Sequence, residues 1–157
     1  MLITFISDTH ARHDQVTTSQ TTQNSTTPPD LPGGDLLIHA GDFMTSGNSR
    51  REAVAFFEWF DQIDNYDTKI FIAGNHDRIM QRESVEEHMR DLLTEYKTID
   101  YLQDAKLELW DDEDQQVNIY GAPWQPDFYN WAFNLPRNSD QMHAVWEAIP
   151  PDTDILI

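Results

Sequence analysis

The chain lacks cysteine, has few basic residues and contains no long apolar run. Without cysteine it can form neither disulfides nor thiolate metal sites. Only 10 of its 157 residues are Lys or Arg against 28 Asp or Glu, and the resulting formal charge of −18 argues against stable binding to nucleic acid or to an anionic membrane. No run approaches membrane-spanning length, and the apolar start is too short for a signal peptide and lacks a basic leader. We therefore expect a soluble, cytoplasmic protein.

The length and the acidic surplus set two further expectations. A chain of 157 residues is about one domain long and can bury a sizeable core. Because the surface repels anions, a phosphate substrate would have to be attracted locally, and a bound metal ion can supply that attraction. Solubility or adaptation to salt would explain the same surplus without a metal.

Three apolar runs, residues 3–6, 35–40 and 70–73, are each followed by polar side chains that can bind metals. These side chains are Asp8 and His10 after the first run, Asp42 after the second, and Asn75, His76 and Asp77 after the third. Ligands in open α/β sheets bind outside the carboxyl ends of the strands, so one site built from all three strand ends is the simplest interpretation. If the backbone stays extended past the first run, Asp8 and His10 point to the same face.

Other patterns predict helices around this sheet. Apolar residues recur at helical spacing over 51–64, with Ser49 as the expected N-cap, and Ser84 with Glu87 forms a capping box for a helix that reaches residue 96. His88 beside that helix is expected to be a surface or boundary histidine. Ser139 is expected to cap a last helix with four inward residues, namely Met142, Val145, Trp146 and Ile149.

Short β patterns cover residues 99–102, 107–110 and 117–121, and a further buried strand begins after residue 154. The acidic run 111–114 predicts a solvated hairpin turn rather than a calcium loop, because the glycine and glutamate spacing of an EF-hand is missing.

Two segments do not fit regular elements. Residues 14–34 are rich in Thr, Ser, Gln, Pro and Gly, and we expect a flexible insertion loop, with a lid over the site as the alternative. Residues 123–136 are broken by proline and rich in aromatic side chains, which either fill the core or stack on a ligand.

The polar set has the chemistry of a metal site. Carboxylate, imidazole and amide ligands suit Mn, Fe, Zn or Mg. A carboxylate shared by two cations can hold them about 3.5–4 Å apart, where they clamp an in-line phosphoryl displacement and lower the pKa of a bridging water. Asp42, the middle member in sequence order, is the natural bridge. The alternative is that three strand ends carry polar residues by accident.

These blocks resemble those of the calcineurin-like metallophosphoesterases: Asp8-x-His10, Gly41-Asp42 and the 74–77 run Gly-Asn-His-Asp. Residues 38–42, 72–77, 120–124 and 134–137 are moreover similar to the small metallophosphoesterase-domain-containing subgroup. The resemblance implies an α/β fold with a two-sheet β-sandwich flanked by helices. It also implies a dinuclear centre of two divalent metal ions, with manganese favoured, and a bridging hydroxide.

The resemblance further implies a role for each residue. Asp8 and His10 would bind the first metal, Asp42 would bridge, and Asn75 would bind the second metal. His76 would be the catalytic acid and Asp77 would tune it, while Arg12, together with Asn75 and His76, would contact the substrate phosphate. His39 would orient a ligand from behind, or be an ordinary strand histidine with a satisfied hydrogen bond.

The family pattern continues with further histidine blocks that do not occur in these 157 residues. The expected domain, 1–157, is therefore C-terminally incomplete, and its second metal would have only Asp42 and Asn75. We expect a metal-dependent phosphoester hydrolase acting on small phosphodiesters or nucleotides. The alternative is a truncated, catalytically impaired relative that serves as a binding or regulatory module or is a nonfunctional fragment. Exposed edge strands would also allow a homodimer.

Overall fold

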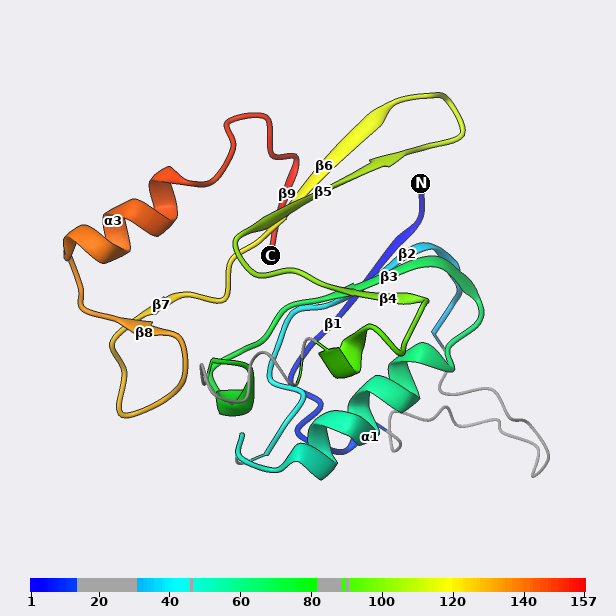
Figure 1. The fold of residues 1–157 in the computed structure, drawn as a ribbon. Coiled ribbons are helices and arrows are strands. Elements are labelled where there is room, and N and C mark those ends of the chain that lie inside the picture. Colours follow the sequence, from blue (N-terminus) through cyan, green and yellow to red (C-terminus); the bar gives the residue numbers. More distant parts are fainter. Residues whose placement is uncertain (14–30, 46, 82–88, 90) are drawn as a thin grey trace.

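The computed structural model describes residues 1–13, 31–45, 47–81, 89 and 91–157 (Figure 1). Most of the expected insertion, the capping box of Ser84 and Glu87, and His88 lie outside the described residues. Among the described residues, no helix combines the length and the apolar character that crossing a bilayer requires.

The first sheet contains four strands in the order β1-β2-β3-β4: β1 (Ile3–Ile6), β2 (Gly34–His39), β3 (Tyr66–Phe71) and β4 (Ile99–Tyr101). All neighbouring strands are parallel, and Ile6 at the end of β1 pairs with His39 at the end of β2, which in turn pairs with Phe71 at the end of β3. The three carboxyl ends are therefore level with one another, so the polar residues that follow them meet at one rim.

The two faces of this sheet pack against different partners because successive side chains of a strand point to opposite faces. Leu37 and Phe71 pack into a core with helix α1 (Arg50–Asp61), whose buried residues include Phe56, Phe57 and Phe60. Leu36, Ile38 and Ile70 pack into a second core on the other face. As expected, the Oγ of Ser49 caps α1 by accepting from the amide of Glu52.

The second core is closed by a three-stranded sheet of β5 (Ala105–Trp110), β6 (Gln116–Gly121) and β9 (Ile155–Leu156). β5 and β6 form an antiparallel hairpin, and β9 runs parallel to β6. The acidic run turns this hairpin, with the amide of Asp111 bonded to the carbonyl of Gln115. Figure 1 shows this sheet on one side of the first sheet and α1 on the other. The predicted α/β fold, two sheets flanked by helices, is confirmed.

The remaining elements are short. The 3-10 helix η2 (Arg78–Met80) follows the third polar block. β7 (Gln125–Pro126) and β8 (Asn134–Leu135) pair within the aromatic loop, where no regular element was expected. Helix α3 (Asp140–Glu147) begins after its predicted N-cap, Ser139.

Three local predictions are wrong, and one stated condition is not met. β3 begins at Tyr66, ahead of the run 70–73 that was expected to form the strand. Trp146 was expected to face inward but is 41% exposed, because α3 buries only Met142. Leu156 in the last strand is exposed rather than buried. The backbone at Asp8 and His10 is not extended, since both residues have left-handed φ angles of 55° and 45°.

Candidate metal centre

Two glycines bring the second and third polar blocks into contact. Gly41 has a φ of 95°, and a Cβ there would lie 2.8 Å from the Cα of Gly74. A Cβ at Gly74 would in turn collide with the carboxylate of Asp42. Only glycine at both positions permits this close approach.

The buried carboxylate of Asp77 holds the same two blocks together. Its Oδ2 accepts from the amides of Asp42 (2.9 Å) and Gly74 (2.7 Å), and its Oδ1 accepts from the amide of Met44 (2.9 Å). Burial raises the pKa of Asp77 to about 7, and the three amides oppose that rise. The contacts of this side chain thus brace the backbone under the rim.

The first block is attached by a ladder of backbone hydrogen bonds. The amides of Asp8, His10 and Ala11 donate to the carbonyls of Gly41, Asp42 and Phe43 at 3.0, 3.0 and 2.8 Å. Left-handed φ angles at Asp8, His10, Ala11 and Asp42 are unfavourable for residues with a Cβ, and the ladder keeps them in place.

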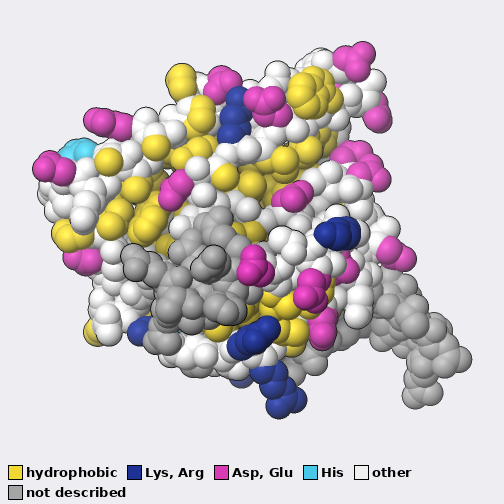
Figure 2. Space-filling view, viewed as in Figure 1, with side chains coloured by type: hydrophobic (Ala, Val, Ile, Leu, Met, Phe, Trp, Pro, Cys, Tyr) yellow, Lys and Arg dark blue, Asp and Glu magenta, His cyan; other side chains and the backbone are white. Residues whose placement is uncertain are grey.

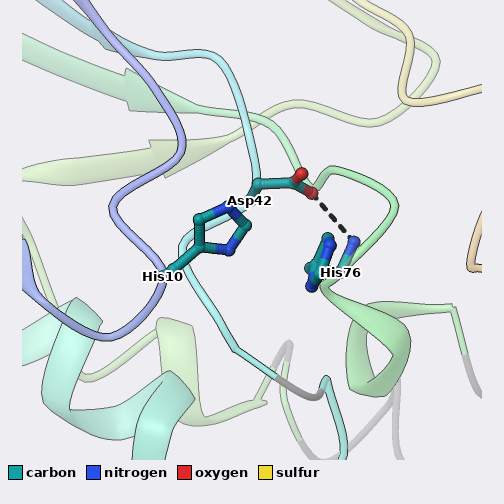
Figure 3. A group of neighbouring side chains, drawn as sticks. All are labelled: His10, Asp42 and His76. Atoms are coloured by element: carbon teal, nitrogen blue, oxygen red, sulfur yellow. Dashed lines mark hydrogen bonds between the residues drawn. The ribbon is translucent and has the colours of Figure 1, made fainter.

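One side chain from each block meets at the rim: His10 after β1, Asp42 after β2 and His76 after β3 (Figure 3). One ligand atom of each lies within 4.8 Å of the others. Asp42 also accepts a 2.8 Å hydrogen bond from the amide of His76 through Oδ1, and the two imidazole centroids are 4.6 Å apart. His76 was expected to be an acid, and its position also allows it to share a metal ion.

Both imidazoles are oriented by backbone carbonyls of the segment after Asp42. The Nδ1 of His10 is 3.1 Å from the carbonyl of Met44, and the Nδ1 of His76 is 2.7 Å from the carbonyl of Thr45. A carbonyl only accepts, so each Nδ1 carries the proton and donates. In a neutral ring with this tautomer, Nε2 has a free lone pair, the form of histidine that binds metals.

The other predicted ligands lie beside this cluster. The Oδ1 of Asp8 is 3.8 Å from the Nε2 of His10, and its side chain is 64% exposed. Asn75 immediately precedes His76 and is half-buried, and its carbonyl accepts from the amide of Ala132.

Arg12, expected to contact phosphate, lines a cavity of about 270 Å³ beside the cluster. The other lining residues are Asp8, Thr9, His10 and Thr45, so the cavity is bordered by two of the expected ligands. Arg12 itself is exposed.

His39 lies behind the first block, where it is completely buried. Its Nε2 is 3.0 Å from the Oγ1 of Thr9, the residue between Asp8 and His10, and its ring packs 4.9 Å from that of Phe56. Burial lowers the pKa of His39 to about 3, so the ring is neutral at physiological pH.

Several supporting groups of the site were not predicted from the sequence. The carbonyls of Met44 and Thr45 act through the backbone, which leaves no trace in residue type. Trp131 packs against His76 with ring centroids 4.2 Å apart, and the guanidinium of Arg78 lies 5.3 Å from the Trp131 ring centre. The aromatic composition of the loop was the available signal for Trp131, although it did not say which ring meets the site.

The residues present fit a divalent metal ion. The cluster offers one carboxylate and two imidazoles with free Nε2 atoms, and a second carboxylate, Asp8, lies next to His10. Oxygen and nitrogen ligands of this kind suit Mn, Fe or Zn, and carboxylate-rich sets suit Mg.

Comparison with known proteins decides the family. A family model described as calcineurin-like phosphoesterase matches residues 1–156. The chain belongs to the calcineurin-like phosphoesterase family.

Two metallophosphoesterase relatives agree with this, and a third relative has a different name. The chain is 35% identical to metallophosphoesterase domain-containing protein 1 of Homo sapiens and of Mus musculus, over 97% of this chain and 46% of each relative. It is 38% identical to the Emericella nidulans protein named "Probable rhamnogalacturonate lyase C", over 83% of this chain and 12% of that protein. The chain thus spans just under half the length of its metallophosphoesterase relatives.

Proposed function

We propose that the protein is a metal-dependent phosphoester hydrolase that acts on phosphodiesters at the rim formed by β1, β2 and β3. The observation that carries this proposal is the meeting of His10, Asp42 and His76, with their ligand atoms within 4.8 Å of one another. Membership in the calcineurin-like phosphoesterase family supports the same reaction class.

In this proposal Asp8 and His10 hold one divalent metal ion, Asn75 holds a second, and Asp42 bridges the pair. Manganese is the favoured ion. The metal ions would neutralise phosphate charge and lower the pKa of the attacking water. The Met44 carbonyl supports this assignment, because it binds the Nδ1 of His10 and leaves Nε2 for the metal. The backbone ladder supports it as well, because it holds Asp8 and His10 beside Asp42.

The chain's own residues then have distinct tasks. Arg12, which lines the cavity beside the first block, would bind a phosphate oxygen through its permanent positive charge. Positively charged side chains are few in this chain, with 10 Lys or Arg against 28 Asp or Glu. His76, with Nδ1 held by the Thr45 carbonyl, would first take up a proton on Nε2 and then give it to the leaving oxygen. Trp131 limits the movement of that ring.

The remaining roles follow from the local contacts. His39 supports the first block through Thr9. Asp77, whose carboxylate accepts from three backbone amides, acts on His76 by shaping the turn that carries it. A small phosphodiester or nucleotide is the proposed substrate, and the cytoplasm is the proposed location. The net charge of −18 disfavours stable nucleic-acid or membrane binding.

The test is manganese-dependent hydrolysis of a generic aryl phosphodiester, with Asp42→Asn assayed alongside to exclude a contaminating enzyme. The proposal expects turnover that depends on added Mn²⁺ and disappears in the variant. A folded protein that binds Mn²⁺ but never turns over would contradict the enzyme proposal and favour a binding or regulatory relative.

A homodimer is proposed through the edge of the first sheet. Among the strands of the described ranges, β1 lies at the edge of the first sheet, and its Phe5 is 56% exposed. Gel filtration that shows only the monomer over a wide concentration range would contradict it.

A further inference from the structure

Glu52, on the first turn of α1, contacts the segment that orients the candidate metal ligands. Its Oε2 accepts a 2.9 Å hydrogen bond from the amide of Thr45. Ser49 and Glu52 have the spacing of a capping box, in which the glutamate normally reaches back to the N-cap amide. Here one carboxylate oxygen extends beyond the helix to the rim, which a purely local capping role does not require.

The contact is informative because the Thr45 amide and the Met44 carbonyl belong to one peptide group. That group is planar and trans, so its N–H and C=O point in opposite directions. On one side the N–H donates to Glu52, and on the other the C=O accepts from the Nδ1 of His10 at 3.1 Å. A change in the tilt of this plane therefore moves the acceptor that orients His10.

The preceding peptide is held in the same way. The amide of Met44 donates to the buried Oδ1 of Asp77, while the carbonyl of Phe43 accepts from the amide of Ala11 at 2.8 Å. In both successive peptides the N–H therefore donates to a carboxylate. The C=O of each accepts from His10 or from Ala11 next to it. Thr45 adds a further tie, because its Oγ1 donates to the carbonyl of His10 at 2.9 Å.

We propose that Glu52 is a positioning residue for metal binding by His10, acting through the Met44–Thr45 peptide. A carboxylate that accepts the N–H polarises the peptide and makes its carbonyl a better acceptor for the imidazole Nδ1–H. This is a carboxylate–histidine arrangement with a peptide group inserted between the two partners. The inference rests on the proposed metal site.

The experiment compares Mn²⁺ binding by calorimetry in the wild type, Glu52→Ala, Glu52→Gln and Glu58→Ala. Glu52→Ala is expected to weaken Mn²⁺ binding by about 5-fold, below the usual 10–100-fold for direct partners of a ligand, because the contact is exposed and acts through one peptide. Glu52→Gln keeps an oxygen acceptor for the Thr45 amide and should recover most of the affinity.

Glu58→Ala is the matched control for charge. Glu58 lies on the same helix and lines the same cavity of about 670 Å³ as Glu52, so its loss removes an equal charge from the same surroundings. Its Mn²⁺ affinity should stay within about 2-fold of the wild type, as expected for a screened surface charge. An equal loss in Glu58→Ala, or unchanged affinity in Glu52→Ala, would overturn the inference.

A second measurement, on the metal-free protein, separates this inference from the proposed function. The ring ¹⁵N signals of His10, recorded at alkaline pH where imidazole is neutral, should show the proton on Nδ1 in the wild type and a mixture of tautomers in Glu52→Ala. Failure of the wild type to bind Mn²⁺ would contradict the proposed metal site alone. A tautomer ratio that is unchanged in Glu52→Ala would contradict the positioning role.

Discussion

The rim of the first sheet and the C-terminal part of the chain are built in different ways. At the rim, buried Asp77 and His39 and a ladder of backbone hydrogen bonds fix four residues with unfavourable φ angles. In the C-terminal part, Trp146 and Leu156 are exposed, and α3 buries only Met142. Figure 2 shows hydrophobic side chains at the surface over the second sheet and α3, with acidic side chains among them.

This difference indicates where structure serves function. Each left-handed residue with a Cβ costs about 1–2 kcal/mol, and such strain persists only where the surroundings enforce it. Three of the four strained residues at the rim, Asp8, His10 and Asp42, are proposed to bind metal. Left-handed residues with a Cβ also occur in the C-terminal part, at the turns of Asp104, Asp114, Tyr129, Phe133 and Asn138. The exposed side chains of α3 and β9 make few buried contacts, so single changes at Trp146 or Leu156 should matter much less.

The largest effect is expected for Asp42→Asn, which removes a carboxylate from the centre of the cluster. Turnover of a phosphodiester should fall at least about 1,000-fold, because loss of the metal removes several kcal/mol of transition-state stabilisation. The free energy of unfolding without metal should change by less than about 1 kcal/mol, since asparagine keeps an oxygen for the His76 amide. Steady-state kinetics and denaturant unfolding measure the two quantities, and unchanged turnover would refute the bridging role.

Asp77→Asn should have the next largest effect, this time on folding. The Asp77 carboxylate accepts hydrogen bonds from three backbone amides. Asparagine has one acceptor oxygen, so its NH₂ group would face at least one of these amides, donor against donor. The free energy of unfolding should fall by about 3 kcal/mol. The same substitution at exposed Asp100 is the control and should change the free energy of unfolding little. Equal stability of the two variants would show that the hydrogen bonds of Asp77 are not needed for folding.

The pH dependence of the free energy of unfolding, compared between the wild type and His39→Gln, tests whether His39 is buried in its neutral form. The pKa of His39 is lowered from 6.5 to about 3, so its contribution to stability is complete above pH 6.5 and is lost as the pH falls towards 3. From pH 6.5 to 5 the wild type should therefore lose about 2 kcal/mol more than the variant. The raised pKa of Asp77 acts in the opposite direction but is common to both proteins. Parallel curves of unfolding free energy against pH would contradict the neutral, buried state of His39.

Trp146→Ala, in the C-terminal part of the chain, should have the smallest effect on stability. Because the indole is largely on the surface of α3, the free energy of unfolding should fall by less than about 1 kcal/mol. Phe57→Ala, in the core between α1 and the first sheet, should cost about 3–5 kcal/mol. Urea titrations of both variants measure the two losses in free energy of unfolding. Equal losses would contradict the difference expected between the C-terminal surface and the core.

The sequence predicted the parts of the fold that depend on side-chain pattern. Apolar runs followed by Asp8, Asp42 and Asn75 indicated three parallel strands with one polar rim, and Ser49 and Ser139 marked the starts of two helices. The same pattern misled at Trp146, because helical spacing identifies an apolar stripe without saying whether anything covers it.

The site was predictable in its side chains but not in its backbone. The residue types of His10 and His76 reveal metal chemistry, whereas the carbonyls of Met44 and Thr45 that orient them belong to every residue type. The left-handed turn at Asp8 and His10 was also hidden, because nothing in these residue types requires it. The contact between Glu52 and Thr45 joins a helix to a loop and becomes visible only in three dimensions.

The most direct test of the metal site is anomalous diffraction from crystals of this chain soaked in Mn²⁺. We expect an anomalous peak within about 2.5 Å of the Nε2 of His10 and of the Asp42 carboxylate, as for coordinated divalent ions. Both Nδ1 atoms should still donate to the carbonyls of Met44 and Thr45. Manganese peaks found only elsewhere on the acidic surface, with this cluster empty, would contradict it.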